Sequence, residues 1–569
     1  MKKRGRFLYK FLIAVEVLFL TFGVSTCNKL PVDRAEREQQ TFHHTSDATH
    51  VTTKQNLDFT ILDDRFYYEG LIDNDAYIFK ITQKGRSGFS GIFYPLDSTI
   101  TWLQPEPFSV SLQNGKSVFS ARNEKISFEF DVVIDSFSIT GTYVEKSFNP
   151  IPKSGHFIFV RYENPPFQRL KEVRYKEEVY GVKVQKDVKY GHAKGFWASY
   201  VLKDTKYLRM LVKNFSKTIT PKDLDLTLDV YYPDEDTVTM RPLFVLLHGG
   251  AFYFGDKGAE TMRLWCEHFA KMGYVVASAN YRMGFMPNKQ SIQRCGYSAI
   301  QDAHAAVRYL VHHAEEYGID TNNVFVGGTS AGSITMLSMV FMNDQNCPDF
   351  VRGHRFAKRF GSLHTADNNL RNTFKVKAIA NMWGAVYELD EIASNPVPTI
   401  SFHGDQDKIV PFDAGVPFSE VKGSIGEMLF DTMYGSQAIH RYLDSLHVRN
   451  EFYPLAGKKH SPYEDANGNV NDIYYFIQDK MQNFFYNTME QDVRIKRVSN
   501  QPLEYVIEHP DVDEVMWKAE GGFVWRMENG KVCVVWRSDA PRHTLVATGR
   551  LRSGLVFYKR MNVSKPYKI

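Results

Sequence analysis

Cysteine is scarce in this sequence. Five cysteines occur among 569 residues, and only Cys266, Cys295, Cys347 and Cys533 lie beyond the N-terminal segment. These four lack the short paired spacings of metal-binding cysteines, so we expect no metal site built from them. An oxidising compartment would allow one disulfide whose pair the sequence does not select, and we expect at least two of the four to be buried free thiols.

Neither sign of charge is in large excess. The chain has 69 lysine and arginine residues against 65 aspartate and glutamate residues, a formal net charge of +4. A basic stripe of the kind that binds phosphate backbones is absent, and we therefore expect no nucleic-acid partner. Internal repeats and low-complexity segments are absent as well.

Long apolar runs are missing after the N-terminal segment, and we therefore expect the mature body to be soluble. The first ten residues are rich in lysine and arginine, and an apolar run over residues 11–24 follows, interrupted only by Glu16 and Thr21. This pattern is typical of a signal peptide, because the run is too short to span a membrane.

The segment Val24-Ser25-Thr26-Cys27 resembles a bacterial lipobox, in which Cys27 would be lipidated and become the new N-terminus. Thr26 departs from the small residue that usually precedes that cysteine. Ordinary cleavage near the same place is one alternative, and an uncleaved anchor is another. We expect a protein that is secreted, periplasmic, or held at the outer membrane or cell surface through lipidated Cys27.

The chain exceeds the ~250 to 300 residues at which a single hydrophobic core stops growing, so we expect two or three domains after a signal peptide of residues 1–27. Residues 28–165 are predicted to form a β-sandwich-like domain of unknown role. Phe108, Val110 and Leu112 alternate with polar residues before an Asn114-Gly115 turn, which indicates antiparallel hairpins with one buried face. Prolines in the segments 149–152 and 164–166 favour a boundary there.

Residues 166–490 differ, because short apolar runs alternate with longer helical patterns. Nearly uninterrupted apolar runs are typical of parallel strands buried on both faces, and they cover residues 243–247, 275–278, 324–327, 376–380 and 399–402. A helix is predicted over 298–317, where alanine and leucine recur at helical spacing. This alternation predicts an α/β fold with a mostly parallel sheet flanked by helices.

Residues 491–569 return to β patterning. Apolar residues alternate with polar ones on both sides of Asn529-Gly530, at Phe523, Trp525 and Met527 before it and at Val532, Val534 and Trp536 after it. This is the signature of a β-hairpin. The preceding stretch Trp517-Lys518-Ala519-Glu520-Gly521-Gly522 resembles the start of immunoglobulin-like repeats attached to secreted bacterial enzymes, which implies an immunoglobulin-like C-terminal domain.

Ser330 is the candidate nucleophile. It lies in Gly328-Thr329-Ser330-Ala331-Gly332, between a predicted strand and a helical pattern over 331–342. A nucleophile on such a sharp turn needs small residues two positions before and after it, since a Cβ there would collide with the neighbouring strand or helix. The pattern also arises by chance in long chains, so its strand-turn-helix context carries the prediction.

A serine hydroxyl needs an imidazole to take its proton and a carboxylate to hold that imidazole in the right tautomer. His460, in the polar loop 457–461, is the candidate base. His440 and His447 lie in a helical pattern and are expected to be surface or core histidines, and His403, which ends a strand, is expected to have a structural role. Asp405 and Asp407 compete as the acid; whichever is not the acid is expected to be a turn residue that bonds nearby backbone.

The tetrahedral intermediate of acyl transfer carries a negative oxygen that preorganised N–H donors must stabilise. His248-Gly249-Gly250-Ala251 directly follows a predicted strand, and glycines there let backbone amides face a substrate. We expect the amides of Gly250, Ala251 and Ala331 to be these donors. A simple turn is the alternative interpretation of the two glycines.

Residues 220–480 resemble the esterase and lipase branch of the α/β-hydrolase superfamily. The order Ser330, Asp407, His460 with an oxyanion loop upstream is the order used by that fold, and the motifs Asp407 to Pro411, Asn280-Tyr281-Arg282 and Asp302-Ala303-His304-Ala305-Ala306 support the likeness. The resemblance favours Asp407 over Asp405 and implies a Ser-His-Asp esterase without metal or cofactor. Ala251 stands where many relatives have a third glycine, which keeps the amide donor and is expected to narrow the acyl pocket.

These residues predict a secreted serine esterase for small-molecule or polysaccharide esters, with acetyl or feruloyl groups as candidate acyl parts. A lipase or peptidase of the same fold is an alternative, although such peptidases usually lack the His-Gly-Gly loop. An inactive surface binding or adhesion protein is another; such relics lose a triad residue, and here all three remain. Phe252 and Trp383 are candidate substrate-binding residues, with a place in the core as the equal alternative.

Overall fold

The computed structural model describes residues 58–564 except 63, 65–66, 73–74, 96–105, 114–115, 122–125, 135–137, 146–153, 163–167, 202–213, 344–360, 365, 420–428, 466–468, 501–502, 529 and 537–540. The expectations for the signal peptide, Cys27, Cys347, the Asn114-Gly115 turn, Asn529 and the proline-rich segments 149–152 and 164–166 therefore fall outside the described residues. None of the helices within these ranges has the length and apolar character needed to cross a membrane.

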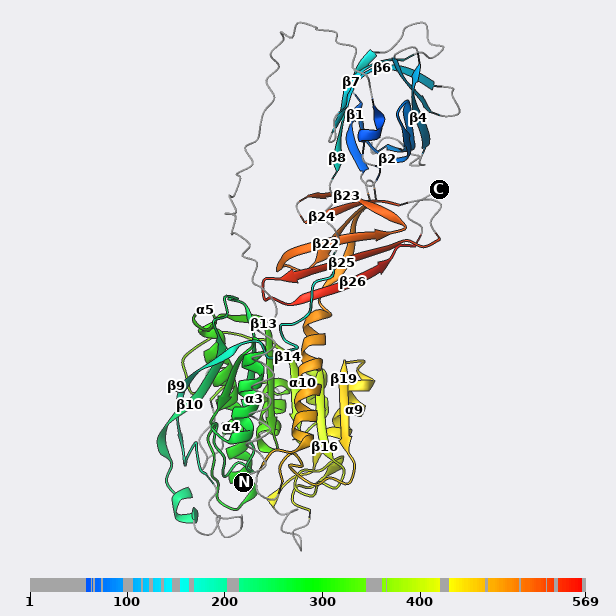
Figure 1. Ribbon diagram of the computed structural model, residues 1–569. Coiled ribbons are helices and arrows are strands. Elements are labelled where there is room, and N and C mark those ends of the chain that lie inside the picture. The colour runs from blue at the N-terminus through cyan, green and yellow to red at the C-terminus, as the bar shows by residue number, and fades with distance from the viewer. Residues whose placement is uncertain are drawn as a thin grey trace, which may run out of the picture. The chain divides into compact units, whose positions relative to one another are not determined.

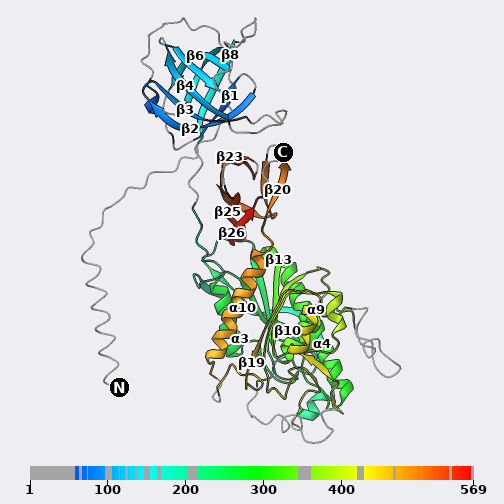
Figure 2. The same ribbon diagram turned by 90° about the vertical axis from the view of Figure 1, so that its right-hand side faces the viewer.

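The N-terminal strands close into a barrel rather than the predicted sandwich (Figure 2). β1 pairs with β8 as well as with β2, so the sheet has no free edge at which to divide into two layers. The period-two pattern correctly indicated one buried face, which Phe108 and Val110 occupy, but such a pattern does not specify closure. The strands are β1 (Tyr67–Ile72), β2 (Asp75–Gly85), β3 (Gly88–Pro95), β4 (Glu106–Gln113), β5 (Lys116–Ala121), β6 (Ile126–Ile134), β7 (Ser138–Glu145) and β8 (Ser154–Tyr162), after a short 3₁₀ helix η1 (Phe59–Ile61).

The central region is built on an eight-stranded sheet in the order β19-β16-β14-β13-β11-β12-β10-β9 (Figure 1). β10 runs antiparallel to both of its neighbours, and the remaining neighbours pair in parallel. The predicted apolar runs lie in β11 to β14 and β16. The strands are β9 (Gly181–Gly195), β10 (Lys222–Asp234), β11 (Arg241–Leu247), β12 (Val275–Ala279), β13 (Ile319–Thr329), β14 (Val376–Met382), β16 (Thr399–Gly404) and β19 (Asn450–Leu455).

Helices cover both faces of this sheet. Figure 2 shows α3 and α10 on one side and α4 and α9 on the other. Along β11, Phe244 and Leu246 join the core cluster of α3 and α10, whereas Leu243, Val245 and Leu247 join that of α4, α6 and α9. Burial on both faces explains why the strand sequences are nearly continuous apolar runs. The helices are α3 (Glu260–Lys271), α4 (Lys289–His312), α5 (Ala314–Tyr317), α6 (Ala331–Phe341), α7 (Asp390–Ser394), α9 (Ser436–Ser445) and α10 (Asp472–Glu490), with a 3₁₀ helix η2 (Phe215–Thr218) and a small sheet of β15 (Ala385–Val386), β17 (Ala414–Gly415) and β18 (Met433–Gly435).

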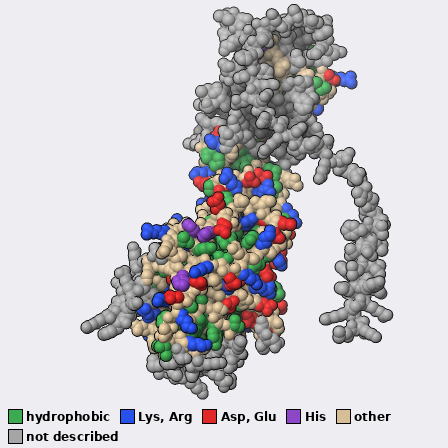
Figure 3. All heavy atoms as spheres, turned by 90° about the vertical axis from the view of Figure 1, so that its left-hand side faces the viewer, with side chains coloured by type: hydrophobic (Ala, Val, Ile, Leu, Met, Phe, Trp, Pro, Cys, Tyr) green, Lys and Arg blue, Asp and Glu red, His purple; other side chains and the backbone are tan. Residues whose placement is uncertain are grey.

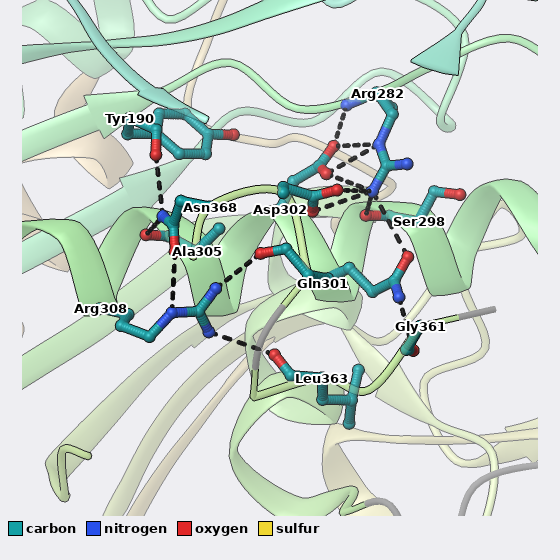
Figure 4. A network of polar contacts seen from close by, with 12 residues as sticks. Tyr190, Arg282, Ser298, Gln301, Asp302, Ala305, Arg308, Gly361, Leu363 and Asn368 are labelled. Atoms are coloured by element: carbon teal, nitrogen blue, oxygen red, sulfur yellow. Dashed lines mark hydrogen bonds and ion pairs between the residues drawn. The ribbon is translucent and has the colours of Figure 1, made fainter. Parts of the chain in front are cut away.

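Helix α4 begins at Lys289 rather than at the predicted residue 298. The Asn288 side chain caps it by accepting a hydrogen bond from the Ser291 backbone N–H at 2.9 Å. A buried polar network holds its middle turns (Figure 4): Arg282 pairs with Asp302 at 2.6 Å, and Arg308 donates to the Ala366 carbonyl at 2.6 Å. The motif residues Arg282 and Asp302 thus act as structural anchors of α4.

The C-terminal strands form two sheets, β20-β21-β24-β23 and β22-β25-β26. Numbered along the chain, the first, second, fifth and fourth strands share one sheet and the third, sixth and seventh share the other, which is the constant-type immunoglobulin order. The predicted hairpin is β23 and β24, and Gly530 between them has a φ of 74°. The strands are β20 (Arg494–Asn500), β21 (Leu503–Glu508), β22 (Val512–Glu520), β23 (Gly522–Glu528), β24 (Lys531–Trp536), β25 (Thr544–Leu551) and β26 (Val556–Asn562).

Charges of both signs are mixed over the surface drawn in Figure 3, where basic and acidic side chains lie interspersed among the described residues. This distribution agrees with the near balance of charges in the sequence.

Candidate active site

The predicted site residues lie in four loops, each of which follows the carboxyl end of a parallel strand. The His248 loop follows β11, Ser330 follows β13, Asp407 follows β16 and His460 follows β19. Because parallel strands end at the same edge of a sheet, these loops converge there.

Ser330 lies on a strained turn between β13 and α6, with φ 53° and ψ −120°. The turn brings α6 so close to β11 that a Cβ on Gly332 would lie 2.3 Å from the Leu247 carbonyl oxygen, and one on Gly328 would lie 2.5 Å from the Gly332 carbonyl carbon. Both glycines are therefore required by backbone contacts, as the sequence predicted. Ser330 itself is 8% exposed.

Ser330, His460 and Asp407 form one hydrogen-bonded chain. His460 Nε2 lies 2.9 Å from Ser330 Oγ, and His460 Nδ1 lies 2.6 Å from Asp407 Oδ2. A neutral imidazole with its proton on Nδ1 donates to the carboxylate and accepts from the serine hydroxyl. This is the arrangement that makes a serine hydroxyl a nucleophile.

Asp407 is buried and fully hydrogen-bonded. Its Oδ1 accepts from the backbone N–H groups of Ile409 at 2.8 Å and Val410 at 3.0 Å, while its Oδ2 faces His460 and also lies 3.3 Å from His403 Nε2. Burial opposes ionisation, but the hydrogen bonds from the two histidines hold the pKa of Asp407 well below its usual range. Asp405 lies apart, with its carboxylate accepting from the Gly457 backbone N–H at 2.8 Å.

A chain of buried polar side chains connects Asp407, through His403, to helix α6. His403 Nδ1 lies 2.8 Å from Ser436 Oγ, and Asn381 Nδ2 donates to that Oγ at 3.1 Å. Ser333, one turn along α6 from Ser330, donates to Asn381 Oδ1 at 2.6 Å. All four side chains are at least 99% buried, so the chain joins α6, β14, α9 and β16 in a low-dielectric setting. Sequence reasoning assigned His403 only a structural role and missed Ser333, Asn381 and Ser436.

The His248 loop lies beside Ser330, because a Cβ on Gly249 would be 3.2 Å from Ser330 Cβ. Gly250, Ala251 and Phe252 all have positive φ, at 116°, 51° and 57°. Within the part of the chain that the structure describes, no group accepts a hydrogen bond from the Gly250, Ala251 or Ala331 backbone N–H. Tyr281, from the Asn-Tyr-Arg motif, braces the loop by donating its hydroxyl to the His248 carbonyl at 2.8 Å.

Two cavities meet at Ser330. The first, of about 320 Å³, follows α6 and is called here the α6 chamber. The second, of about 620 Å³, includes His460 and Ser461 in its wall and is called the His460 chamber. Ser330, Ala251 and Phe418 belong to both walls, whereas His460 lines only the second. An ester bound at Ser330 therefore has separate space for its two halves.

The two predicted substrate-binding aromatics differ in position. Phe252 lines the α6 chamber. Trp383 is fully buried, stacks on Tyr463 with ring centroids 4.9 Å apart, and lines neither chamber, so it lies in the core, the alternative that the sequence left equal. Its ring lies edge-on to the His460 ring, with centroids 6.4 Å apart. The backbone φ of Trp383 is 47°. His440, buried against Asn450, is also part of the core.

Cys266, Cys295 and Cys533 are buried free thiols, and the described residues contain no group of histidine, cysteine and carboxylate side chains arranged to hold a metal ion. Burial raises the pKa of Cys295 to about 12 and holds that of Cys266 well above its usual value, which makes both poor nucleophiles.

Comparison with known proteins gives partial matches. A family model described as BD-FAE matches residues 228–396, which include the His248 loop and Ser330 and end before Asp407. Gut esterase 1 of Caenorhabditis elegans is 28% identical over 120 residues, covering 20% of this chain and 21% of that protein. Para-nitrobenzyl esterase of Bacillus subtilis is 31% identical over 121 residues, covering 21% and 24%. The chain thus spans less than a quarter of the length of these relatives.

Among solved structures, esterase 2 of Thermogutta terrifontis phosphorylated by paraoxon matches 55% of this chain and 96% of its own, at 20% identity and a TM-score of 0.34. The family match covers the His248 loop and the Ser330 turn, and both follow strands of the mixed eight-stranded sheet. Residues 228–396 are therefore similar to the BD-FAE family, and parts of the chain are similar to proteins named as esterases.

Proposed function

We propose that this chain is a carboxylic ester hydrolase that acts through an acyl-enzyme on Ser330. The observation that carries the proposal is the continuous contact from Ser330 Oγ through His460 to Asp407, at 2.9 and 2.6 Å. The curated relatives with esterase names support the same chemistry.

The reaction begins when Ser330 Oγ attacks the ester carbonyl carbon as its proton passes to His460 Nε2. The carbonyl oxygen becomes an oxyanion, and the amides of Gly250, Ala251 and Ala331 stabilise it. Collapse of this intermediate breaks the bond to the alcohol oxygen, which takes the proton from His460. Water then gives a proton to His460 and attacks the acyl carbon. Collapse of the second intermediate breaks the bond between the acyl carbon and Ser330 Oγ, which takes the proton back from His460, and the acid is released.

Each half of the ester substrate is expected to bind in one of the two chambers. Because His460 must protonate the departing alcohol, the alcohol occupies the His460 chamber and the acyl group occupies the α6 chamber. The alcohol chamber is the larger of the two, at about 620 Å³ against 320 Å³, which suits a sugar or other bulky alcohol. We propose polysaccharide esters as the natural substrates, and the α6 chamber favours an acyl group longer than acetyl, such as feruloyl.

The test compares wild type, Ser330→Ala and a matched control, Ser445→Ala, whose hydroxyl lies on the exposed side of α9. Wild type and the control should hydrolyse 4-nitrophenyl butyrate, and Ser330→Ala should lose almost all activity while its melting temperature stays within a few degrees. Near-wild-type hydrolysis by Ser330→Ala contradicts the assignment. Release of ferulate or acetate from substituted xylan then identifies the natural acyl group.

We also propose export, with a mature N-terminus at or near Cys27. The basic start and the short apolar run over residues 11–24 support this. Mass spectrometry of the mature protein distinguishes a lipid on Cys27 from plain cleavage, and an intact Met1 contradicts both.

A further inference from the structure

The α6 chamber is elongated along its helix. One face of α6 and the residue after it line the chamber, through Ala331, Ile334, Thr335, Ser338 and Met342. These positions recur every three or four residues, which is one side of a helix. With about 1.5 Å of rise per residue, Ser338 lies roughly 12 Å along the axis from Ser330. The chamber therefore accepts a long, narrow acyl group.

Glu391 lies at the far end of this chamber. It belongs to α7, which packs on the last turn of α6: Ser394 Oγ donates to the Phe341 carbonyl at 3.3 Å, and Asn395 Nδ2 donates to the Val340 carbonyl at 2.8 Å. Glu391 lines the chamber and is 8% exposed. The described residues supply no hydrogen bond or ion pair to its carboxyl group.

A buried carboxyl group without a partner is costly and calls for an explanation, and a ligand that completes its hydrogen bonds would supply one. Burial, aided by the neighbouring Glu388 carboxylate, raises the pKa of Glu391 to about 7. The chamber's other acidic side chains differ from it, because Glu388 is exposed and Asp431 is paired with Lys289 and Gln293. Glu391 thus stands alone among the chamber's described acids in being both buried and unpaired.

We propose that Glu391 is the recognition point for a hydroxyl group at the distal end of an elongated acyl group, a specificity that rests on the proposed esterase function. A hydroxyl both donates and accepts, which matches a carboxyl group that titrates near neutrality. Acyl groups that end in a carboxylate are disfavoured, because Glu391 and Glu388 make this end acidic.

The experiment uses two methyl esters that differ only in the distal hydroxyl, methyl 4-hydroxycinnamate and methyl cinnamate. Because the alcohol is the same, the ratio of their kcat/KM values reports the acyl end alone. The enzymes are wild type, Glu391→Leu, the near-isosteric Glu391→Gln, and Asp390→Asn as a control on the exposed side of α7. Melting temperatures verify that each variant is folded.

Wild type and Asp390→Asn should prefer the hydroxylated ester by about tenfold to a hundredfold, the range for a hydrogen bond to a charged group. Glu391→Leu should abolish the preference and Glu391→Gln should retain part of it. In wild type the preference should rise as pH increases from 6 to 8, because the ionised carboxylate accepts more strongly, and it should be flat with pH in Glu391→Gln.

An unchanged ratio in folded Glu391→Leu overturns the proposal, as does a wild-type preference for the unsubstituted ester. Stronger preference for methyl 4-(aminomethyl)cinnamate, which ends in an ammonium group, also overturns it in favour of a cation site. Failure of the esterase function looks different, because neither ester would then be hydrolysed faster by wild type than by Ser330→Ala.

Discussion

Replacing Asp407 with asparagine tests the acid of the triad most directly, because the surroundings dictate how the amide must lie. Two backbone N–H groups, from Ile409 and Val410, point at Oδ1. An NH₂ group placed there would face two donors, so the amide oxygen must take the Oδ1 position. The NH₂ group then faces His460 Nδ1, at the position of the present 2.6 Å contact.

This orientation reverses the tautomer of His460. Its Nδ1 must accept from the amide, so the imidazole proton moves to Nε2, where it faces Ser330 and can no longer take the serine proton. The same change in a related triad lowered kcat about 10⁴-fold, which corresponds to about 5 kcal/mol of transition-state stabilisation. We expect a loss of that order for Asp407→Asn. Asp405→Asn should leave kcat close to wild type, since its amide oxygen still accepts from Gly457.

Steady-state hydrolysis of 4-nitrophenyl butyrate by both variants provides the comparison. If Asp407→Asn kept more than a tenth of the wild-type kcat, or if Asp405→Asn lost as much, the assignment would fail. Stability provides a second measurement. Because the folded-state pKa of Asp407 is depressed, its contribution is present above the unfolded-state value near 4 and is lost as pH falls below it. The wild-type advantage over Asp407→Asn in unfolding free energy should therefore shrink below pH 4.

Three further changes give distinct outcomes. His403→Leu removes the donor 3.3 Å from Asp407 Oδ2 and should lower kcat about 10-fold or more with little change in KM. It should also alter the acid limb of the pH–rate profile, which a merely structural role of His403 would not do. Gly332→Ala places a methyl group 2.3 Å from a backbone oxygen and should lower the unfolding free energy of the protein by roughly 1 to 3 kcal/mol in chemical denaturation. Gly296→Ala, within α4 and with nothing within 4 Å, should instead raise it by up to about 1 kcal/mol. Equal effects of the two substitutions would refute the crowding argument. If Cys27 carries a lipid, Cys27→Ser should appear in the soluble fraction with unchanged specific activity, and persistent membrane association would place the attachment elsewhere.

The parts of the site that sequence reasoning located are those with a local signature. Ser330 follows from two glycines between a strand and a helix, and the choice of Asp407 over Asp405 from the residues that follow it. The C-terminal hairpin followed from alternation and the parallel strands from unbroken apolar runs, whereas the immunoglobulin-like domain was implied only by the resemblance of residues 517–522. In each of these cases the residues that determine the local structure are close to it in the sequence, so a short pattern records them.

The features that sequence reasoning missed depend on residues far apart in the chain. Barrel closure is decided by the pairing of β1 with β8, which no local pattern records. The link between Ser333, Asn381 and His403 joins three elements, and each residue alone reads as an ordinary polar side chain in a buried strand or helix. Trp383 illustrates the converse, because an aromatic beside a strand end has the same sequence context whether it faces a cavity or the core.

The positive φ angles around Ser330 have a consequence for heating. Ala251, Phe252, Ser330 and Trp383, none of them glycine, have φ between 47° and 57°. At about 1 to 2 kcal/mol each, this conformation costs roughly 4 to 8 kcal/mol, a large share of the 5 to 15 kcal/mol by which a domain is normally stable. The surrounding core holds these turns in place only while it is intact. Hydrolytic activity should therefore decline with temperature before the bulk of the secondary structure melts. Substitutions that stabilise the core should raise the highest temperature at which the enzyme is active more than they raise kcat.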